Sequence, residues 1–385
     1  MFTTGNSAGS ATRTSARSIR DGAAHRESSF TGSGLSPGNN ASYVTSAEDL
    51  ATRPEEFMDW AREVKLDPII KETVPEAAVF NRIRDLQRAS KVFPRWCRTP
   101  NSSKFGSIST SHYKWRDRLC SALREQKCDL QDDQDLSLPC ALAFVFQACC
   151  RHAEVFSSNR RRLASKRDMR THIDCLMGLD GDMPMEYSTG RELRLPATAS
   201  NKINAANYDF RVAASAFYTD SITDEDLILV HCVTAYAPIG CGENRMKIGI
   251  VSALYQKRVL GIQDQFVFGV FQFEEDFLQV VAGIWQFDEI KIYKVGNYSL
   301  RDSFSLSQFY LVLRGIKQLA SVYLDQLMDS EKALLTAIET NLPANEWAPV
   351  ERGLSLKLAA LEEWDRDERV NAFLEGMRFE SCDQK

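Results

Sequence analysis

The chain has 385 residues and a net charge of −5, and 44% of its residues are hydrophobic. This hydrophobic content excludes disorder along the whole chain, and the length allows one large domain or two with additional tails. The negative net charge argues against a protein that binds nucleic acid over its whole surface, because phosphate neutralisation supplies most of the affinity in that class. A local basic patch remains compatible with this charge.

The longest hydrophobic run, residues 136–150, contains Pro139 and Gln147 and is too short to span a bilayer, so no membrane partner is expected. The ten cysteines are irregularly spaced, which does not suggest a disulfide framework, and the first residues contain no apolar signal segment. We therefore expect reduced thiols and an intracellular location, in the nucleus or the cytoplasm.

Residues 1–45 are rich in Ser, Thr, Gly, Asn and Arg and lack hydrophobic periodicity, which predicts a disordered N-terminal tail. The arginines of this tail also match a mitochondrial transit peptide, but the apolar face of such a peptide is nearly absent. Residues 46–195 form a predicted helical region, because hydrophobic residues recur there at intervals of three and four. The expected helices lie at 46–66, 75–91, 113–127 and 136–163, and a loop or hairpin is expected at 180–196.

Residues 196–335 are predicted to form an α/β core. Runs of β-branched and aromatic residues indicate its strands, and hydrophobic residues at helical spacing indicate its helices. The expected order is a strand ending at 208–210, a strand at 227–236, a helix at 245–261, three hairpin-connected strands within 265–295 and a helix at 306–327. Residues 336–385 are predicted to form an acidic helical tail that lies on the body or on a protein partner.

Six short stretches of this core carry a resemblance to a known family. They are Tyr208-Asp209-Phe210, Ser252-Ala253-Leu254-Tyr255, Phe268-Gly269-Val270, Ala282-Gly283-Ile284-Trp285, Gln308-Phe309-Tyr310 and Leu313-Arg314-Gly315-Ile316. With them, residues 203–323 resemble fungal proteins of the PD-(D/E)XK nuclease-like class. The resemblance implies a mixed sheet flanked by helices, in which a strand–strand–helix core is followed by a strand with Phe-Gly, a strand ending near Trp and a final helix.

The catalytic pattern of this class is an Asp at the end of one strand and a Glu-x-Lys on the next, which together hold Mg²⁺ for phosphodiester hydrolysis. Asp209 lies where the resemblance implies the first carboxylate, but the next strand carries His231 and no Glu-x-Lys. Glu243 and Lys247, near the start of the following helix, are the candidates for displaced catalytic residues. In an active enzyme, Asp209 and His231 would hold the metal, with Glu243 as a third ligand, and Mg²⁺ is the only cofactor implied.

A literal Glu-x-Lys occurs at Glu289–Lys291, with Asp276 upstream. The predicted hairpin places Asp276 at the end opposite to Glu289, roughly 25 Å away, because each strand residue advances the chain by about 3.3 Å. These two acids are therefore not expected to share a metal ion, and the tripeptide is interpreted as solvated.

Six cations lie within eleven residues: Arg160, Arg161, Arg162, Lys166, Arg167 and Arg170. On a helix they would form a basic stripe, which predicts binding to the phosphate backbone of DNA or RNA. Two alternatives remain open for this segment: a nuclear localisation signal, and a solvated helix face that pairs with the acidic tail.

Because the Glu-x-Lys is missing, the first functional hypothesis is a catalytically degenerate nuclease-like protein that acts by binding nucleic acid. The second is a divergent Mg²⁺-dependent nuclease that uses Asp209. The third is a protein-interaction scaffold with the acidic C-terminal helix as its contact surface, since a fold alone does not determine function.

Overall fold

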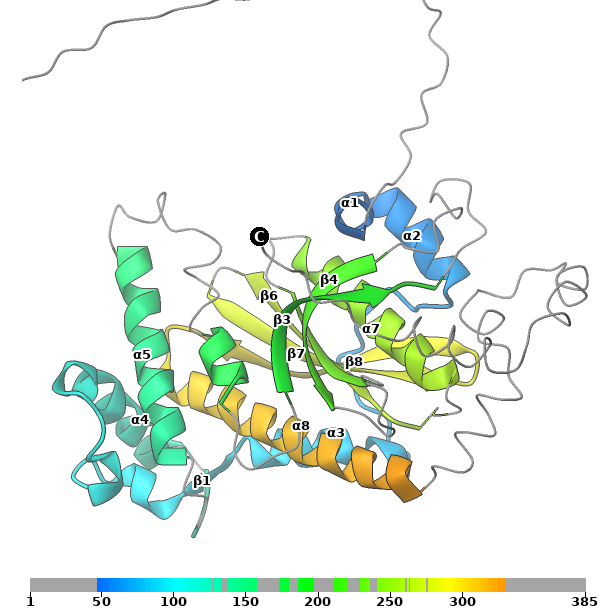
Figure 1. Cartoon of the computed structure of the whole chain (residues 1–385). Helices are drawn as coiled ribbons and strands as arrows, with labels where there is room; N and C mark the ends of the chain where they lie inside the picture. Colours follow the sequence, from blue (N-terminus) through cyan, green and yellow to red (C-terminus); the bar gives the residue numbers. More distant parts are fainter. Residues whose placement is uncertain are drawn as a thin grey trace, which may run out of the picture. The chain divides into compact units, whose positions relative to one another are not determined.

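The computed structural model describes residues 47–126, 128–132, 138–157, 173–179, 186–196, 211–219, 229–235, 241–259, 262, 264–274 and 276–329. These residues form a mixed α/β structure, with a sheet, flanking helices and further helices that precede the sheet in the chain (Figure 1). The predicted α/β class is confirmed. The predicted disordered tail at 1–45 and the predicted helical tail at 336–385 lie outside the described residues.

The sheet and its crossover helix have the bounds β3 Glu186–Arg194, β4 Arg211–Thr219, β5 Leu229–Ala235, α7 Gly242–Val259, β6 Val267–Glu274, β7 Phe277–Gln286 and β8 Glu289–Ser299. The six strands follow one another across the sheet in chain order. β5 and β6 are parallel, and every other neighbouring pair is antiparallel. The parallel pair explains the helical connection, because a tight turn joins only antiparallel strands.

Two strands differ from the sequence predictions. β3 lies in the segment predicted as a loop or hairpin, inside the predicted helical region 46–195. It is an edge strand paired only with β4, and an edge strand tolerates a polar, charged sequence that a search for hydrophobic alternation does not detect. β4 begins at Arg211, directly after residues 208–210, where the first core strand was predicted to end.

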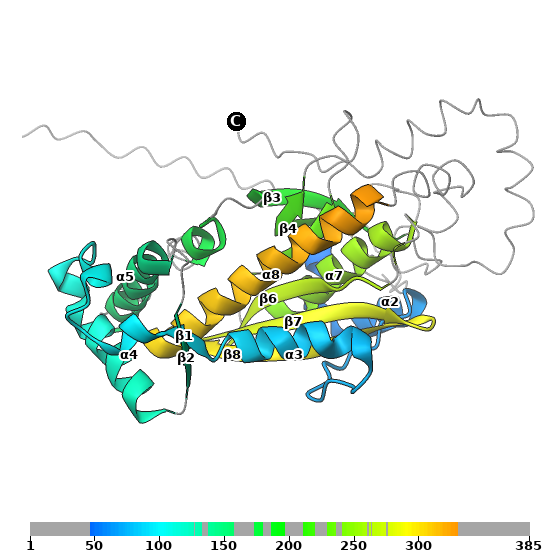
Figure 2. The same cartoon turned by 90° about the horizontal axis from the view of Figure 1, so that it is seen from below.

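Helices cover both faces of the sheet. The helices outside the crossover are α1 Ala47–Thr52, α2 Pro54–Glu63, α3 Asn81–Ala89, α4 Tyr113–Glu125, α5 Leu138–Ser157 and α8 Ser303–Asp329. α1 and α2 share a hydrophobic core with α7 on one face, and α3, α4 and α5 share a second core with α8 on the other (Figure 2). A separate two-stranded parallel sheet is formed by β1 Val92–Pro94 and β2 Asp129–Gln131, and short 3₁₀ turns lie at Ala78–Phe80, Arg95–Arg98, Ser103–Phe105 and Thr110–His112.

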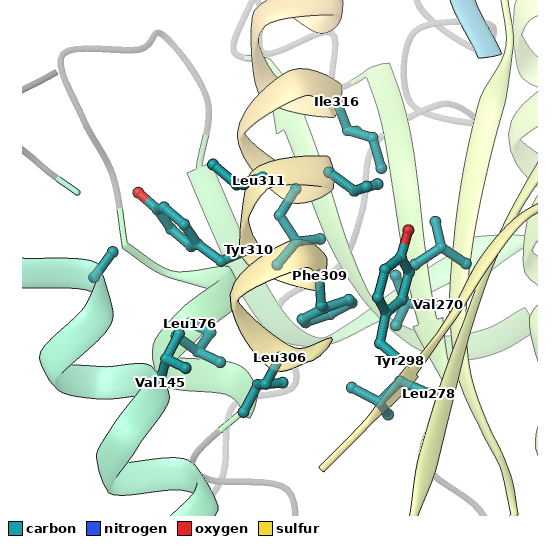
Figure 3. Packing of buried hydrophobic residues seen from close by; sticks show 14 of the residues in the cluster. Val145, Leu176, Val270, Leu278, Tyr298, Leu306, Phe309, Tyr310, Leu311 and Ile316 are labelled. Atoms are coloured by element: carbon teal, nitrogen blue, oxygen red, sulfur yellow. The ribbon is translucent and has the colours of Figure 1, made fainter. Parts of the chain in front are cut away.

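Side chains of β6 alternate between these two cores, as the two-residue period of a strand requires. Val267 and Phe271 belong to the core under α7, whereas Phe268 and Val270 belong to the core under α8. On α8, Phe309 points toward the sheet and lies 5.6 Å from the ring of Tyr298 (Figure 3). The long helix is therefore anchored in the centre of the second core.

Two glycines allow α7 to lie close to the sheet. A Cβ atom on Gly269 would lie 2.6 Å from Sδ of Met246, and a Cβ atom on Gly283 would lie 2.4 Å from Cγ2 of Ile250. Both distances are far below van der Waals contact, so a larger side chain at either position would require Met246, Ile250 or the whole of α7 to move. Packing thus explains the glycines in two of the stretches that carry the sequence resemblance.

The edge of β8 is covered by residues 65–71, which follow α2. The backbone N–H of Asp67 donates to the carbonyl of Ile290 at 2.9 Å, and the N–H of Lys71 donates to the carbonyl of Ile292 at 2.8 Å. The segment runs parallel to β8 without forming a regular strand. It satisfies backbone groups that an open edge would expose to other chains.

The turn between β7 and β8 holds a strained and exposed residue. Phe287 has a φ of 56° and a fully exposed side chain. We expect Phe287→Gly to raise the free energy of unfolding by about 1 kcal/mol, because glycine adopts positive φ without a steric penalty. Urea unfolding checks this expectation, with Asp288→Gly as the control, because Asp288 is the other turn residue and does not have a positive φ. Equal effects of the two substitutions would contradict the role of backbone strain.

Candidate functional site

Most of the residues predicted to act in the site lie outside the described part of the chain. Asp209 is one of them, and so are the six cations of the basic stripe, Arg160, Arg161, Arg162, Lys166, Arg167 and Arg170. The placement of these seven residues therefore stays a prediction. The described residues place the other three candidates, His231, Glu243 and Lys247.

His231 and Glu243 lie at opposite ends of the β5–α7 unit. His231 is near the start of β5, where its Nδ1 is 3.5 Å from the Nζ of Lys257 in the last turn of α7. Glu243 is in the first turn of α7 and contacts Lys247. Ten helical residues separate Lys247 from Lys257, which corresponds to about 15 Å along the axis. The structure therefore does not bring His231 and Glu243 together as ligands of one metal ion.

Glu243 and Lys247 form a buried contact with the chain that follows α2. The Nζ of Lys247 lies 2.5 Å from a carboxylate oxygen of Glu243 and 2.5 Å from the carbonyl oxygen of Pro68. Lys247 is buried, whereas Glu243 is partly exposed. These contacts hold the start of α7 against the segment that covers β8, which is a structural role.

The remaining acids do not form a metal site within the described residues. In that part of the chain, no three His, Cys, Asp or Glu side chains are grouped closely enough to hold a metal ion. The prediction that Glu289 and Asp276 lie at opposite ends of the hairpin is confirmed, because Glu289 pairs with Gln286 while Asp276 precedes β7. Asp276 instead accepts from His152 at 2.7 Å, which ties α5 to the β6–β7 turn.

A group that the sequence did not predict stands out in the described residues. We call it the buried polar cluster and define it as Arg82, His231, Lys257, Gln265 and Tyr323. Its members come from α3, β5, α7, the segment before β6, and α8, in that order. Lys257 comes from one helical layer and Tyr323 from the other. The cluster therefore joins the two layers next to the N-terminal end of β6.

Lys257 is the centre of this cluster and is fully buried. Its Nζ donates to Oε1 of Gln265 at 3.2 Å and to the carbonyl oxygen of Phe266 at 3.1 Å, and it lies 3.5 Å from Nδ1 of His231. All three partners are neutral acceptors. Lys257 is therefore hydrogen-bonded but has no carboxylate partner among the described residues.

Tyr323 supplies the surface around which the nitrogen groups gather. The guanidinium carbon of Arg82 is 4.7 Å from the centre of its ring, and the Nζ of Lys257 is 5.0 Å from the same point. The imidazole of His231 stacks on the ring at 6.1 Å. The hydroxyl of Tyr323 accepts from the backbone N–H of Phe266 at 3.2 Å, which fixes the ring relative to β6.

Burial controls the ionisation of this cluster. Burial is the main cause that lowers the pKa of Lys257 to about 7; the charge of Asp264 opposes this shift, and the charge of Arg82 adds to it. Burial, together with Lys257, also holds the pKa of His231 well below its usual range. The imidazole is therefore neutral near pH 7, and Lys257 is close to the midpoint of its titration.

Two nitrogen atoms of the cluster are buried without a hydrogen-bond partner among the described residues: Nη1 of Arg82 and Nε2 of His231. Since Nδ1 of the neutral His231 accepts from Lys257, its Nε2 carries the hydrogen and is a donor. Nη1 of Arg82 is a donor in every state. A buried donor without an acceptor is costly, so these two atoms identify the cluster as the candidate functional site.

His231 lies in this cluster, where the described residues place no acidic side chain beside it, and its predicted metal partner Asp209 lies outside the described residues, so the metal site stays a prediction. Among the helices in the described part of the chain, none has the length and hydrophobicity of a membrane-spanning segment.

Comparisons of the chain with protein-family models, with curated proteins and with solved structures found no match.

Proposed function

We propose that the chain is a catalytically degenerate, nuclease-like protein that acts by binding nucleic acid. The order of elements from β4 to α8 supports this proposal, because it follows the order that the sequence resemblance implies. β4, β5 and α7 correspond to the strand–strand–helix core. β6 carries Phe268 and Gly269, β7 ends near Trp285, and α8 is the final helix.

The sequence of β5 is the observation that favours binding over hydrolysis. Its described residues, Leu229–Ala235, contain no Asp, Glu or Lys and are all buried. The nearby carboxylate of Glu243 is engaged by Lys247, and His231 is at the other end of α7. A Mg²⁺ site needs several oxygen ligands on one ion, and among the described residues of this region only Glu243 supplies a carboxylate, which Lys247 already engages.

The binding surface in this proposal is the basic stripe at 160–170. Its six cations would neutralise phosphates and release counterions, which makes the affinity dependent on salt. A chain with net charge −5 needs such a local concentration of positive charge in order to bind a polyanion.

Simultaneous replacement of Arg160, Arg161 and Arg162 by glutamine should weaken binding to DNA or RNA. Each lost phosphate contact reduces the slope of log K against log salt by about 0.9 for a duplex, so three contacts reduce it by about 2.7. Fluorescence anisotropy with labelled duplex and single-stranded probes at several salt concentrations measures both effects. The control replaces three exposed arginines elsewhere, Arg62, Arg88 and Arg151.

Equal affinity and slope in the wild type and in the Arg160–Arg162 variant would overturn the assigned surface. The catalytic alternative is tested by incubating plasmid DNA and structured RNA with Mg²⁺ or Mn²⁺. Cleavage that Asp209→Ala abolishes would reject the degenerate assignment in favour of an active nuclease. Absence of both binding and cleavage would leave the scaffold hypothesis, in which the C-terminal helical tail contacts a protein.

A further inference from the structure

We propose that the buried polar cluster is a binding site for a small oxyanion such as phosphate, through the free donors of Arg82 and His231 and the positive charge of Lys257. The inference is independent of the nucleic-acid function proposed above, because it rests on different residues. It also concerns the end of the β5–α7 unit that is opposite to Glu243 and Lys247.

The hydrogen-bonding pattern of the cluster calls for an acceptor. Arg82 offers the unpartnered Nη1, and His231 offers the unpartnered Nε2. The three N–H groups of a protonated Lys257 are already taken up by His231, Gln265 and Phe266, so its ammonium group adds positive charge, not a free donor, beside the same tyrosine ring. A ligand that satisfies donors only must itself be rich in acceptors, and the oxygens of a phosphate group meet this requirement.

The charge of the cluster points to the same ligand class. Arg82 keeps its positive charge at every physiological pH, and a protonated Lys257 adds a second charge beside it. Within the described residues no carboxylate forms an ion pair with either side chain, and Asp264, which interacts with Lys257 through its charge, is exposed. A buried ammonium such as that of Lys257 is unfavourable without a counter-charge, and a bound anion offsets this penalty.

The fold positions these groups rigidly. Lys257 is fixed by Gln265 and by the carbonyl of Phe266, and Tyr323 is fixed by the N–H of Phe266. Gln265 also donates from Nε2 to the backbone carbonyl of Tyr323 at 3.4 Å. The donors are therefore held by a network that spans α7, β6 and α8, as a preorganised binding site requires. Arg82 is the partly exposed member, so exchange with solvent would occur on its side.

The direct test is equilibrium dialysis of the full chain against radiolabelled inorganic phosphate at pH 7 and constant ionic strength. We expect one phosphate to bind per chain, and Arg82→Gln and Lys257→Gln each to weaken the binding at least ten-fold. Arg82→Gln is the decisive variant if Lys257→Gln fails to fold, since Arg82 is partly exposed. Lys247→Met is the matched control, because it removes the other buried lysine of α7 and should leave phosphate binding unchanged.

Absence of bound phosphate on the wild-type chain would overturn the proposal, and so would equal binding by the wild type and Arg82→Gln.

A competition experiment with the same labelled phosphate identifies the natural source of the oxyanion. Displacement of phosphate by a 5′-phosphorylated dinucleotide, but not by its 5′-hydroxyl form, would support a phosphate carried by a nucleotide. Failure of both dinucleotides to displace it, with binding by the wild type retained, would support free phosphate.

Discussion

Replacing Lys257 by methionine should strongly change the pH dependence of stability between about pH 7 and 10. Burial lowers the pKa of Lys257 to about 7, while an unfolded lysine titrates near 10.4. A difference of this size corresponds to about 5 kcal/mol of unfolding free energy, at about 1.4 kcal/mol per pH unit.

The sign of this effect follows from proton counting. Between about pH 7 and 10 the unfolded chain holds a proton on Lys257 that the folded chain lacks, so the contribution of Lys257 to stability increases with pH. Below pH 7 both states are protonated and the full burial penalty is present. We therefore expect the stability of Lys257→Met relative to the wild type to be greatest below pH 7 and to decline as the pH rises toward 10.

Guanidinium unfolding of both proteins at pH 7, 8, 9 and 10 measures this difference. Loss of the hydrogen bonds of Lys257 changes the free energy of unfolding by an amount that does not depend on pH. The titration of Lys257 is therefore read from how the difference between the two proteins changes with pH. Gln256→Met is a suitable control, because it replaces a buried polar neighbour on the same helix without removing a titratable group. Parallel curves for the wild type and Lys257→Met would show that Lys257 keeps its proton in the folded chain.

Introducing valine at Gly283 should destabilise the fold by about 3 kcal/mol, at the upper end of what overpacking usually costs. The new Cβ would lie 2.4 Å from Cγ2 of Ile250, and α7 cannot move away without losing its contacts with β6. The gain in strand propensity from glycine to valine is smaller than this clash. Urea unfolding gives the change in free energy.

A double-mutant cycle with Ile250→Ala tests the cause of this loss. Removing the Ile250 side chain deletes the atom that the new valine meets, so the two substitutions together should cost less than the sum of their separate effects. Additive effects would mean that the glycine is required for a reason other than the close approach of α7.

The sequence predicted those elements whose hydrophobic pattern is strong. The all-apolar β5, the aromatic β6 and the long inward face of α8 were expected at nearly their observed positions. β3 was not expected, because its Glu, Arg, Ser and Thr residues resemble a loop and only its partner strand keeps it in the sheet. The covering of the β8 edge by residues 65–71 was also unexpected, since it depends on backbone hydrogen bonds and leaves no side-chain pattern.

The candidate site was less predictable than the fold. His231 was singled out from the sequence, but as a metal ligand, because it lies on the strand after Asp209, where the family pattern has Glu-x-Lys instead of a histidine. Its actual neighbours, Lys257 and Tyr323, are 26 and 92 residues away in the chain. No spacing rule connects residues from five separate elements. The sequence around Lys257 gave no signal either, because the lysine lies between Gln256 and Arg258 in the last turn of α7, where basic residues are ordinarily solvated.

The covering of β8 has a consequence for how the chain folds during synthesis. The contact between Glu72 and Lys294 spans 222 residues. At a translation rate of about 5–20 residues per second, residues 65–71 wait roughly 10–45 s before the strand that they cover leaves the ribosome. For most of that time, until β5 and α7 are made, the hydrophobic face of α2, with Phe57 and Trp60, lacks its partners in the core. Molecular chaperones that shield exposed hydrophobic surface should therefore have their largest effect on this chain before β8 is made.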